Sequence, residues 1–262
     1  MNFTSIKTTL KKALFKALRI LGILLVIYIS MVFYLALTER RNAFPRAIFH
    51  KEANEAIKQT AKVLSCTLDD GTVLEGFSLG NGNAPLLLYY PEADEDAAQF
   101  LAQTGTIPNV TLVTFNYRGS ANNKGTPSAK NFESDAIQIA ECAAQINGMF
   151  PQILAGRGTG AILAAEQWKK GQQLVFIDPI FNIADAIAEK YRLLYPKFLI
   201  RTNILFDTSK LKSDVEHIGI IYDRKIFETR TREQTQKIKN AKTINRNGES
   251  LRSAIEMLLK IN

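Results

Sequence analysis

The chain has 262 residues, of which 46% are hydrophobic and 22% are charged, and it carries a formal net charge of +8 with only two cysteines. The ordinary apolar content and the modest numbers of glycine and proline exclude a disordered or collagen-like chain, and the scarcity of cysteine excludes a scaffold held by several disulfides. We expect one globular domain of about 200 residues with an appendage.

The positive charge is concentrated near the N-terminus. Up to Arg41 the chain contains seven lysines and arginines and a single acidic residue, Glu39, which leaves a net charge of only +2 for the rest. A protein that binds nucleic acid is expected to carry its excess positive charge on the folded domain. We therefore expect no nucleic-acid partner.

Residues 20–38 (ILGILLVIYISMVFYLALT) contain no charged side chain. Nineteen helical residues rise by roughly 30 Å, which matches the hydrocarbon core of a bilayer. We predict one transmembrane helix here, preceded by a basic tail (1–19) and followed by a juxtamembrane linker (39–60), so that the membrane bilayer is a partner. A cleaved signal peptide is the main alternative, but its apolar region is usually shorter and ends in small residues.

Basic residues flank this segment on both sides, five before it and four after it (Arg40, Arg41, Arg46 and Lys51). The small excess on the N-terminal side favours a cytoplasmic N-terminus. The globular part is then predicted to lie outside the cytoplasm.

In residues 61–262, Asp70 and Gly71 separate two runs of β-branched and apolar residues, which predicts a tight hairpin. Strand-like and helix-like segments then alternate. The predicted strands are 85–90, 110–115, 152–155, 174–177, 218–222 and 242–245, and the predicted helices are 94–103, 128–146, 159–170, 228–239 and 250–260. This order predicts an α/β fold with a mostly parallel sheet, an N-terminal hairpin and flanking helices. Residues 179–214 interrupt the alternation and are expected to form a lid-like insertion.

Two motifs, NYRGSANNKGTPS at 116–128 and ILAGRGTGA at 153–161, resemble the α/β-hydrolase superfamily. They are most similar to its branch of N-terminally membrane-anchored serine hydrolases, which combines Tyr-Arg-Gly and Gly-Thr-Pro-Ser segments with a Gly-Arg-Ser-x-Gly nucleophile elbow. The resemblance extends from about Val63 to Leu259. It implies an α/β-hydrolase-like domain at 61–262 and, taken alone, a divergent serine-type ester or lipid hydrolase.

The catalytic residues that the resemblance implies are altered. The nucleophile position of the elbow holds Gly158, which has no oxygen to attack a carbonyl group. The acid position corresponds to Lys225, with Asp223 as a possible substitute, and the base position falls in a stretch that ends at Glu249 and contains no histidine. An acid that orients an absent histidine has no catalytic use.

No other side chain is predicted to replace this machinery. His217 precedes the strand at 218–222, so it belongs at the opposite end of the sheet from the elbow, and His50 lies in the linker with no motif around it. Ser120 and Thr159 are the remaining candidate nucleophiles; neither has a recognisable base, and Thr159 is expected to cap its helix. We predict a catalytically inactive binding or regulatory pseudoenzyme.

A second alternative is a dinucleotide-binding protein. Gly156, Gly158 and Ala161 fit the glycine fingerprint between a strand and a helix, and Asp178 ends the next strand about twenty residues later. The fingerprint usually opens its domain, whereas here it follows the hairpin and two βα units. We expect no cofactor on this account.

The N-terminus of the helix at 159–170 is a candidate anion site under either interpretation. It could bind a small anionic ligand, or it could be filled by a side chain such as Glu92 or Glu249. The candidate ligand-binding residues are Arg157, Thr159, Gly160, Tyr90 and Glu92, with Tyr90-Pro91 at the oxyanion position that the resemblance implies. An unknown protein is the other possible partner.

The two cysteines, Cys66 and Cys142, are too few and too far apart in the sequence for a metal site, and none is expected. We predict two buried thiols and not a disulfide, even if the domain lies outside the cytoplasm.

Overall fold

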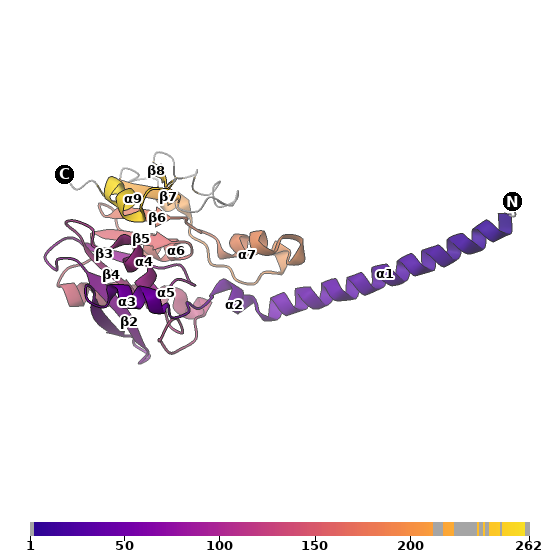
Figure 1. The fold of residues 1–262 in the computed structure, drawn as a ribbon, viewed down its shortest axis with the longest axis horizontal. Helices are drawn as coiled ribbons and strands as arrows, with labels where there is room; N and C mark the ends of the chain where they lie inside the picture. Colours follow the sequence, from indigo (N-terminus) through magenta and orange to yellow (C-terminus); the bar gives the residue numbers. More distant parts are fainter. Residues whose placement is uncertain are drawn as a thin grey trace.

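The computed structural model describes residues 3–211, 217–222, 235, 238, 241–246 and 248–259. A long helix, α1 (Phe3–Leu37), extends away from an α/β domain, and two short helices, α2 (Glu39–Ala43) and α3 (Lys51–Ile57), connect them (Figure 1). The part of α1 from Lys11 to Leu37 is long and apolar enough to cross a membrane, and only 6% of its most apolar window is buried. Since α1 begins at Phe3, the predicted basic tail continues the same helix.

The described strands form one eight-stranded sheet in the order β1-β2-β4-β3-β5-β6-β7-β8. The β1–β2 and β2–β4 pairs are antiparallel and the other pairs are parallel. The strands are β1 (Lys62–Thr67), β2 (Val73–Leu79), β3 (Leu86–Tyr90), β4 (Thr111–Phe115), β5 (Ile153–Arg157), β6 (Gln173–Ile177), β7 (Ile218–Tyr222) and β8 (Lys242–Asn245). The predicted hairpin and mostly parallel sheet are confirmed.

Helices cover both faces of the sheet. One face packs on α3, α4 (Ala97–Thr104) and α9 (Leu251–Leu258), and the other packs on α5 (Ala129–Asn147) and α6 (Gly160–Gln167). All residues of β3, β4 and β5 are buried, as expected for central strands covered on both sides. The predicted helix at 228–239 lies outside the continuously described segments.

Two of the helices differ in detail from their prediction. Helix α6 ends at Gln167, earlier than expected, because Trp168 is extended and its indole N–H donates to the Gln172 carbonyl at 2.8 Å. Helix α4 begins three residues later than expected, because Asp96 caps it by accepting from the Ala98 amide at 3.0 Å.

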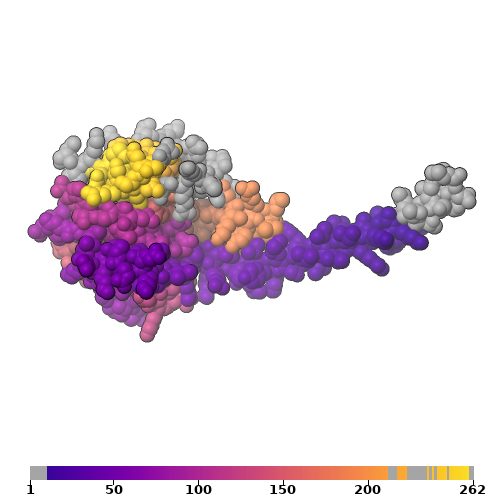
Figure 2. Space-filling model, viewed as in Figure 1, coloured from indigo at the N-terminus to yellow at the C-terminus, as the bar shows by residue number. Residues whose placement is uncertain are grey.

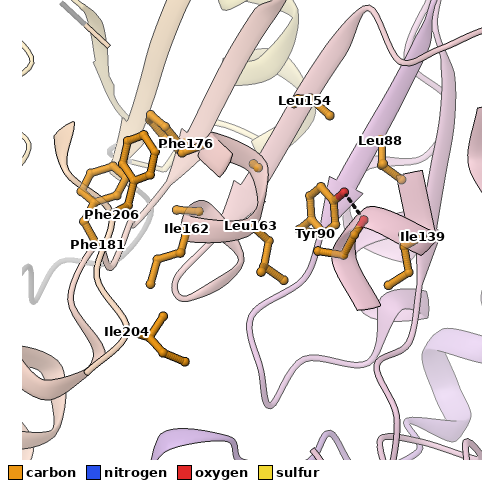
Figure 3. Packing of buried hydrophobic residues seen from close by; sticks show 14 of the residues in the cluster. Leu88, Tyr90, Ile139, Leu154, Ile162, Leu163, Phe176, Phe181, Ile204 and Phe206 are labelled. Carbon is orange, nitrogen blue, oxygen red and sulfur yellow. Dashed lines mark hydrogen bonds between the residues drawn. The ribbon is translucent and has the colours of Figure 1, made fainter. Parts of the chain in front are cut away.

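The insertion contains α7 (Ile183–Tyr191) and three 3-10 turns: η1 (Arg192–Leu194), η2 (Lys197–Leu199) and η3 (Thr208–Leu211). Its aromatic residues join the core beside α6, as Figure 3 shows. The Phe181 ring lies 5.0 Å from that of Phe176 and 6.1 Å from that of Phe206, measured between centroids. The insertion is therefore anchored in the core.

The insertion also holds the linker that follows α1. The Glu39 carboxylate is buried and accepts hydrogen bonds from the Tyr195 hydroxyl (2.7 Å), the Arg201 amide (2.9 Å) and the Thr202 amide and hydroxyl (2.6 and 2.7 Å). The Tyr191 hydroxyl donates to the Asn42 side chain at 2.8 Å. These bonds join the base of α1 to the insertion.

The two cysteines form a disulfide between β1 and α5, so the prediction of two free thiols was wrong. The packing of α5 beside β1 brings their Cα atoms within 5.7 Å, although they are 76 residues apart in the sequence. A local sequence pattern does not predict a contact between residues so far apart in the sequence.

We expect Glu39 to make the stability of the chain depend on acidic pH. Burial raises the pKa of Glu39, but the hydrogen bonds from Tyr195, Thr202 and Arg201 outweigh it and hold the pKa below 4.5. A carboxylate with a lowered folded-state pKa stabilises the fold above its unfolded-state pKa, and this contribution is lost as pH falls through the folded-state value.

The free energy of unfolding of the wild type should therefore exceed that of Glu39→Gln at neutral pH, and this excess should shrink as pH falls below about 4.5. Denaturant unfolding of the full chain in detergent at a series of pH values measures it. Glu55→Gln removes an exposed carboxylate and is the control. An excess that stays constant down to about pH 3 would contradict the assignment.

Candidate functional site

The candidate site is the turn between β5 and α6. Gly158 follows Arg157, the last residue of β5, and has φ +53°, in the left-handed region. Its amide donates to the Ile177 carbonyl at 3.0 Å, and its carbonyl accepts from the Ile180 amide at 2.9 Å. A strand, a tight turn and a helix thus follow one another as in a nucleophile elbow, with Gly158 in the turn.

The glycines on either side of Gly158 are required by close backbone contacts. A Cβ on Gly156 would lie 2.3 Å from the Gly160 carbonyl oxygen, and a Cβ on Gly160 would lie 2.3 Å from the Tyr90 carbonyl oxygen. Contacts this short with backbone atoms leave room for glycine alone. The first and last glycines of the Gly-x-Gly-x-Gly pattern are therefore explained by packing.

Glu92 occupies the space in front of Gly158. A Cβ on Gly158 would lie 2.7 Å from both Cδ and Oε1 of Glu92. Glu92 follows β3, and the Tyr117 hydroxyl donates to the carbonyl of the preceding Pro91 at 2.9 Å. Of the two side chains expected to fill the site, the structure brings Glu92 to the elbow. Glu249 is exposed in the loop before α9.

Arg157 forms a buried ion pair with Glu95, with Nη1 at 2.6 Å from Oε1. The other oxygen of Glu95 accepts from the Tyr89 hydroxyl at 2.6 Å and from the Glu92 amide at 3.1 Å. Burial and the adjacent Glu95 carboxylate raise the pKa of Tyr89, so its hydroxyl remains a donor. The predicted ligand-binding guanidinium of Arg157 is thus engaged within the protein.

Two other side chains that were predicted to bind a ligand, those of Tyr90 and Thr159, are buried. The Tyr90 hydroxyl lies in the core and donates to the Ala136 carbonyl at 2.9 Å (Figure 3). Thr159 occupies the N-cap position of α6, but its side chain makes no capping hydrogen bond, so the predicted cap was wrong. Its hydroxyl is buried with no hydrogen-bond partner among the described residues.

Neither histidine of the sequence lies at the elbow. His50 is the N-cap of α3, where its Nδ1 accepts from the Ala53 amide at 3.2 Å. His217 is exposed and precedes Ile218, which pairs with Leu174 near the amino end of β6, whereas Gly158 follows the carboxyl end of β5. The prediction that His217 lies at the opposite end of the sheet is confirmed.

Ser120, the other candidate nucleophile, contacts the linker. The Ser120 hydroxyl is buried and accepts from the Ala47 amide at 3.0 Å, so it holds the linker on the domain. Asp223 and Lys225, predicted at the acid position, lie outside the described residues.

The Tyr-Arg-Gly motif has a structural role that the sequence left unassigned. The Arg118 guanidinium binds both carboxylate oxygens of Asp135 on α5, at 2.6 and 2.7 Å, and Nη1 lies 2.7 Å from Asp70 in the hairpin turn. The Arg118 guanidinium lowers the pKa of Asp70 to about 2. This residue joins the hairpin, the loop after β4 and α5, and no local pattern pointed to its partners.

The sequence matches no protein-family model, and a search of curated proteins found no match. Solved structures are similar to it over most of its length. An esterase from Pyrococcus furiosus covers 82% of this chain and 95% of its own, with a TM-score of 0.58 and 15% identity. An alpha-beta hydrolase from Vibrio vulnificus covers 78% and 81%, with a TM-score of 0.60 and 14% identity.

A proline iminopeptidase-related protein from Thermus thermophilus covers 76% of this chain and 97% of its own, with a TM-score of 0.58 and 12% identity. The chain has the α/β-hydrolase fold. In this fold the glycine-rich turn follows the third of the parallel strands along the chain, β5. The dinucleotide interpretation lacks its structural context, because a Rossmann domain opens with the fingerprint and has a different strand order.

We expect Gly158→Ala to destabilise the chain more than Gly148→Ala. Both glycines have left-handed φ angles, +53° and +67°, so alanine costs about 1–2 kcal/mol at either position. Only at Gly158 does a Cβ also meet Glu92; nothing lies within 4 Å of a Cβ on Gly148.

Denaturant unfolding of the two variants measures the difference. In the Glu92→Ala background, the cost of Gly158→Ala should fall to about that of Gly148→Ala, because the displaced carboxylate is gone. Equal costs for the two alanines in the wild-type background would show that Glu92 does not fill the elbow.

Proposed function

We propose that this protein is a membrane-anchored α/β-hydrolase-fold pseudoenzyme, which binds or regulates and does not hydrolyse. The observation that carries the proposal is the elbow, where Gly158 stands at the nucleophile position and the Glu92 carboxylate lies 2.7 Å from the place of a Cβ. Acyl transfer at such an elbow needs an attacking oxygen and a base within hydrogen-bond reach. Glycine supplies no oxygen, and both histidines lie elsewhere.

The filled elbow also bears on the kind of partner. An anionic ligand at the N-terminus of α6 would have to displace the Glu92 carboxylate next to Gly158. The buried pair of Arg157 and Glu95 further reduces the positive charge offered to such a ligand. These contacts favour a partner that binds outside the elbow.

The competing function is a divergent ester or lipid hydrolase, which the similarity to an esterase from Pyrococcus furiosus favours. That reading requires another hydroxyl to act, and Ser120 and Thr159 are the candidates near the sheet edge. The Ser120 hydroxyl contacts the Ala47 amide and the Thr159 hydroxyl is buried, and both observations support the proposed inactive protein over the hydrolase.

Our proposal places the domain outside the cytoplasm, with α1 as an uncleaved anchor. The length and apolar composition of α1 support the anchor. The disulfide between Cys66 and Cys142 supports a location of the domain on the side of the membrane away from the cytoplasm, because disulfides persist in oxidising compartments and are rare in the cytosol.

A fluorophosphonate probe should leave the purified full-length protein unlabelled, because Gly158 has no hydroxyl and neither histidine lies at the elbow. An active serine hydrolase in the same reaction is the positive control. The variant Gly158→Ser with Glu92→Ala, which restores the hydroxyl without a base, should also remain unlabelled. Labelling of the wild type that disappears in Ser120→Ala or Thr159→Ala would establish the competing hydrolase.

The placement of the domain can be tested with thiol reagents on intact cells that express the full chain. In Cys66→Ser, the partly exposed Cys142 is left as a thiol, and it should react with a membrane-impermeant maleimide. The matched control is Ser5→Cys in the Cys66→Ser/Cys142→Ser background, which should react only with a permeant reagent. The reverse pattern would place the domain in the cytoplasm.

A further inference from the structure

A basic groove of about 970 Å³ lies where α1 joins the domain. Its walls come from the end of α1, the linker after it, the loop before α5 and the end of α7. The cationic residues that line it are Arg40, Arg41, Arg46 and Lys190. We call it the juxtamembrane groove.

Among the described residues that line the juxtamembrane groove, none is acidic. All four of its cationic side chains belong to exposed residues. Two of them contact neutral groups: Arg46 donates to the Thr126 hydroxyl at 3.3 Å, and the Lys190 ammonium lies 5.6 Å from the centre of the Tyr191 ring. The described part of the lining thus presents positive charge and no carboxylate, which suits an anion.

The position of the groove at the end of α1 indicates that the anion is the headgroup of a membrane lipid. Tyr34 and Leu35 of α1 and Thr38 directly after it line one wall, at the end of the apolar segment Lys11–Leu37. If α1 spans a bilayer, as the proposed function holds, this level is that of the lipid headgroups, where tyrosine and arginine side chains are favoured. A phosphate group of a membrane lipid would lie within reach of the groove.

The insertion adds an apolar surface next to the groove. Leu193 and Phe198 in its 3-10 turns are 85% and 84% exposed, values that a water-facing surface would disfavour. The Tyr28 hydroxyl donates to the Leu193 carbonyl at 3.0 Å, so this surface lies beside the apolar part of α1. Figures 1 and 2 show the insertion projecting from the domain along α1.

The depth of this contact follows from helix geometry. Tyr28 precedes Thr38 by ten residues, a rise of about 15 Å along α1. Since Tyr28 binds the Leu193 carbonyl, η1 extends from the level of the groove toward the hydrocarbon core. The groove for a headgroup is thus followed along α1 by the exposed side chain of Leu193.

We infer that the juxtamembrane groove is a binding site for an anionic phospholipid. Arg46, Lys190 and the arginines of α2 bind its phosphate, and its acyl chains lie along α1 and the exposed side chains of Leu193 and Phe198. This inference rests on the membrane anchoring in the proposed function. It is independent of whether the elbow is catalytic.

The test uses the full chain in phosphatidylcholine nanodiscs with a trace of photoreactive phosphatidylglycerol. The double variant Arg46→Gln/Lys190→Gln should lose about tenfold in crosslinking yield, because two cations that face the phosphate are removed. Lys58→Gln/Lys170→Gln removes the same charge from exposed residues outside the groove and should retain the wild-type yield. Unlabelled phosphatidylglycerol should compete, and additional phosphatidylcholine should not.

Three results would overturn the inference. Equal losses in the two double variants would show general electrostatic attraction. Competition by soluble glycerol phosphate as effective as that by phosphatidylglycerol would assign the groove to a free phosphate. Unchanged crosslinking in Arg46→Gln/Lys190→Gln would place the lipid elsewhere. Release of the chain from membranes by alkaline carbonate is a separate readout, which would refute the anchoring itself and with it the lipid site.

Discussion

The fold depends on one close crossing of backbones, where the ends of β3 and β5 meet the start of α6. A Cβ at Gly156 or Gly160 would lie 2.3 Å from a carbonyl oxygen of the crossing chain, so two glycines are needed before any question of chemistry arises. The crossing sets α6 against the sheet, where Ile162 and Leu163 enter the core (Figure 3). This turn therefore has a packing role of its own, because the sheet and its covering helix need it whatever residue stands at position 158.

Next to this crossing, charged side chains of the protein itself lie at the carboxyl edge of the central strands. In open α/β sheets this edge usually binds the ligand. Here Arg157 and Glu95 form a buried pair, and Glu92 lies in front of Gly158. Breaking such a pair would leave an uncompensated buried charge, which is strongly unfavourable. The edge is thus arranged as a closed, internally paired structure, and binding at another surface becomes the simpler expectation.

Local patterns predicted the parts of the chain whose structure is local. Continuous apolar runs marked β3 and β6, Asp70 and Gly71 marked the hairpin, and the motif placed Gly158 at the elbow. Contacts between distant segments were beyond such patterns. The disulfide joins residues 76 apart, and the Glu39 carboxylate binds groups more than 150 residues away. The missing cap of Thr159 has a similar origin, because the tight crossing, and not capping preference, sets its backbone.

The insertion is attached to the linker that follows α1. The sequence predicts a lid-like insertion at 179–214, and in the structure Tyr195 and Thr202 of this insertion bind Glu39, directly after the apolar helix. The insertion is anchored in the core by Phe181 and bound to the linker by the buried Glu39 carboxylate, so it connects the domain to the base of α1. These contacts hold the domain in its orientation relative to α1. In an anchored chain, the same surface of the domain would always face the lipids.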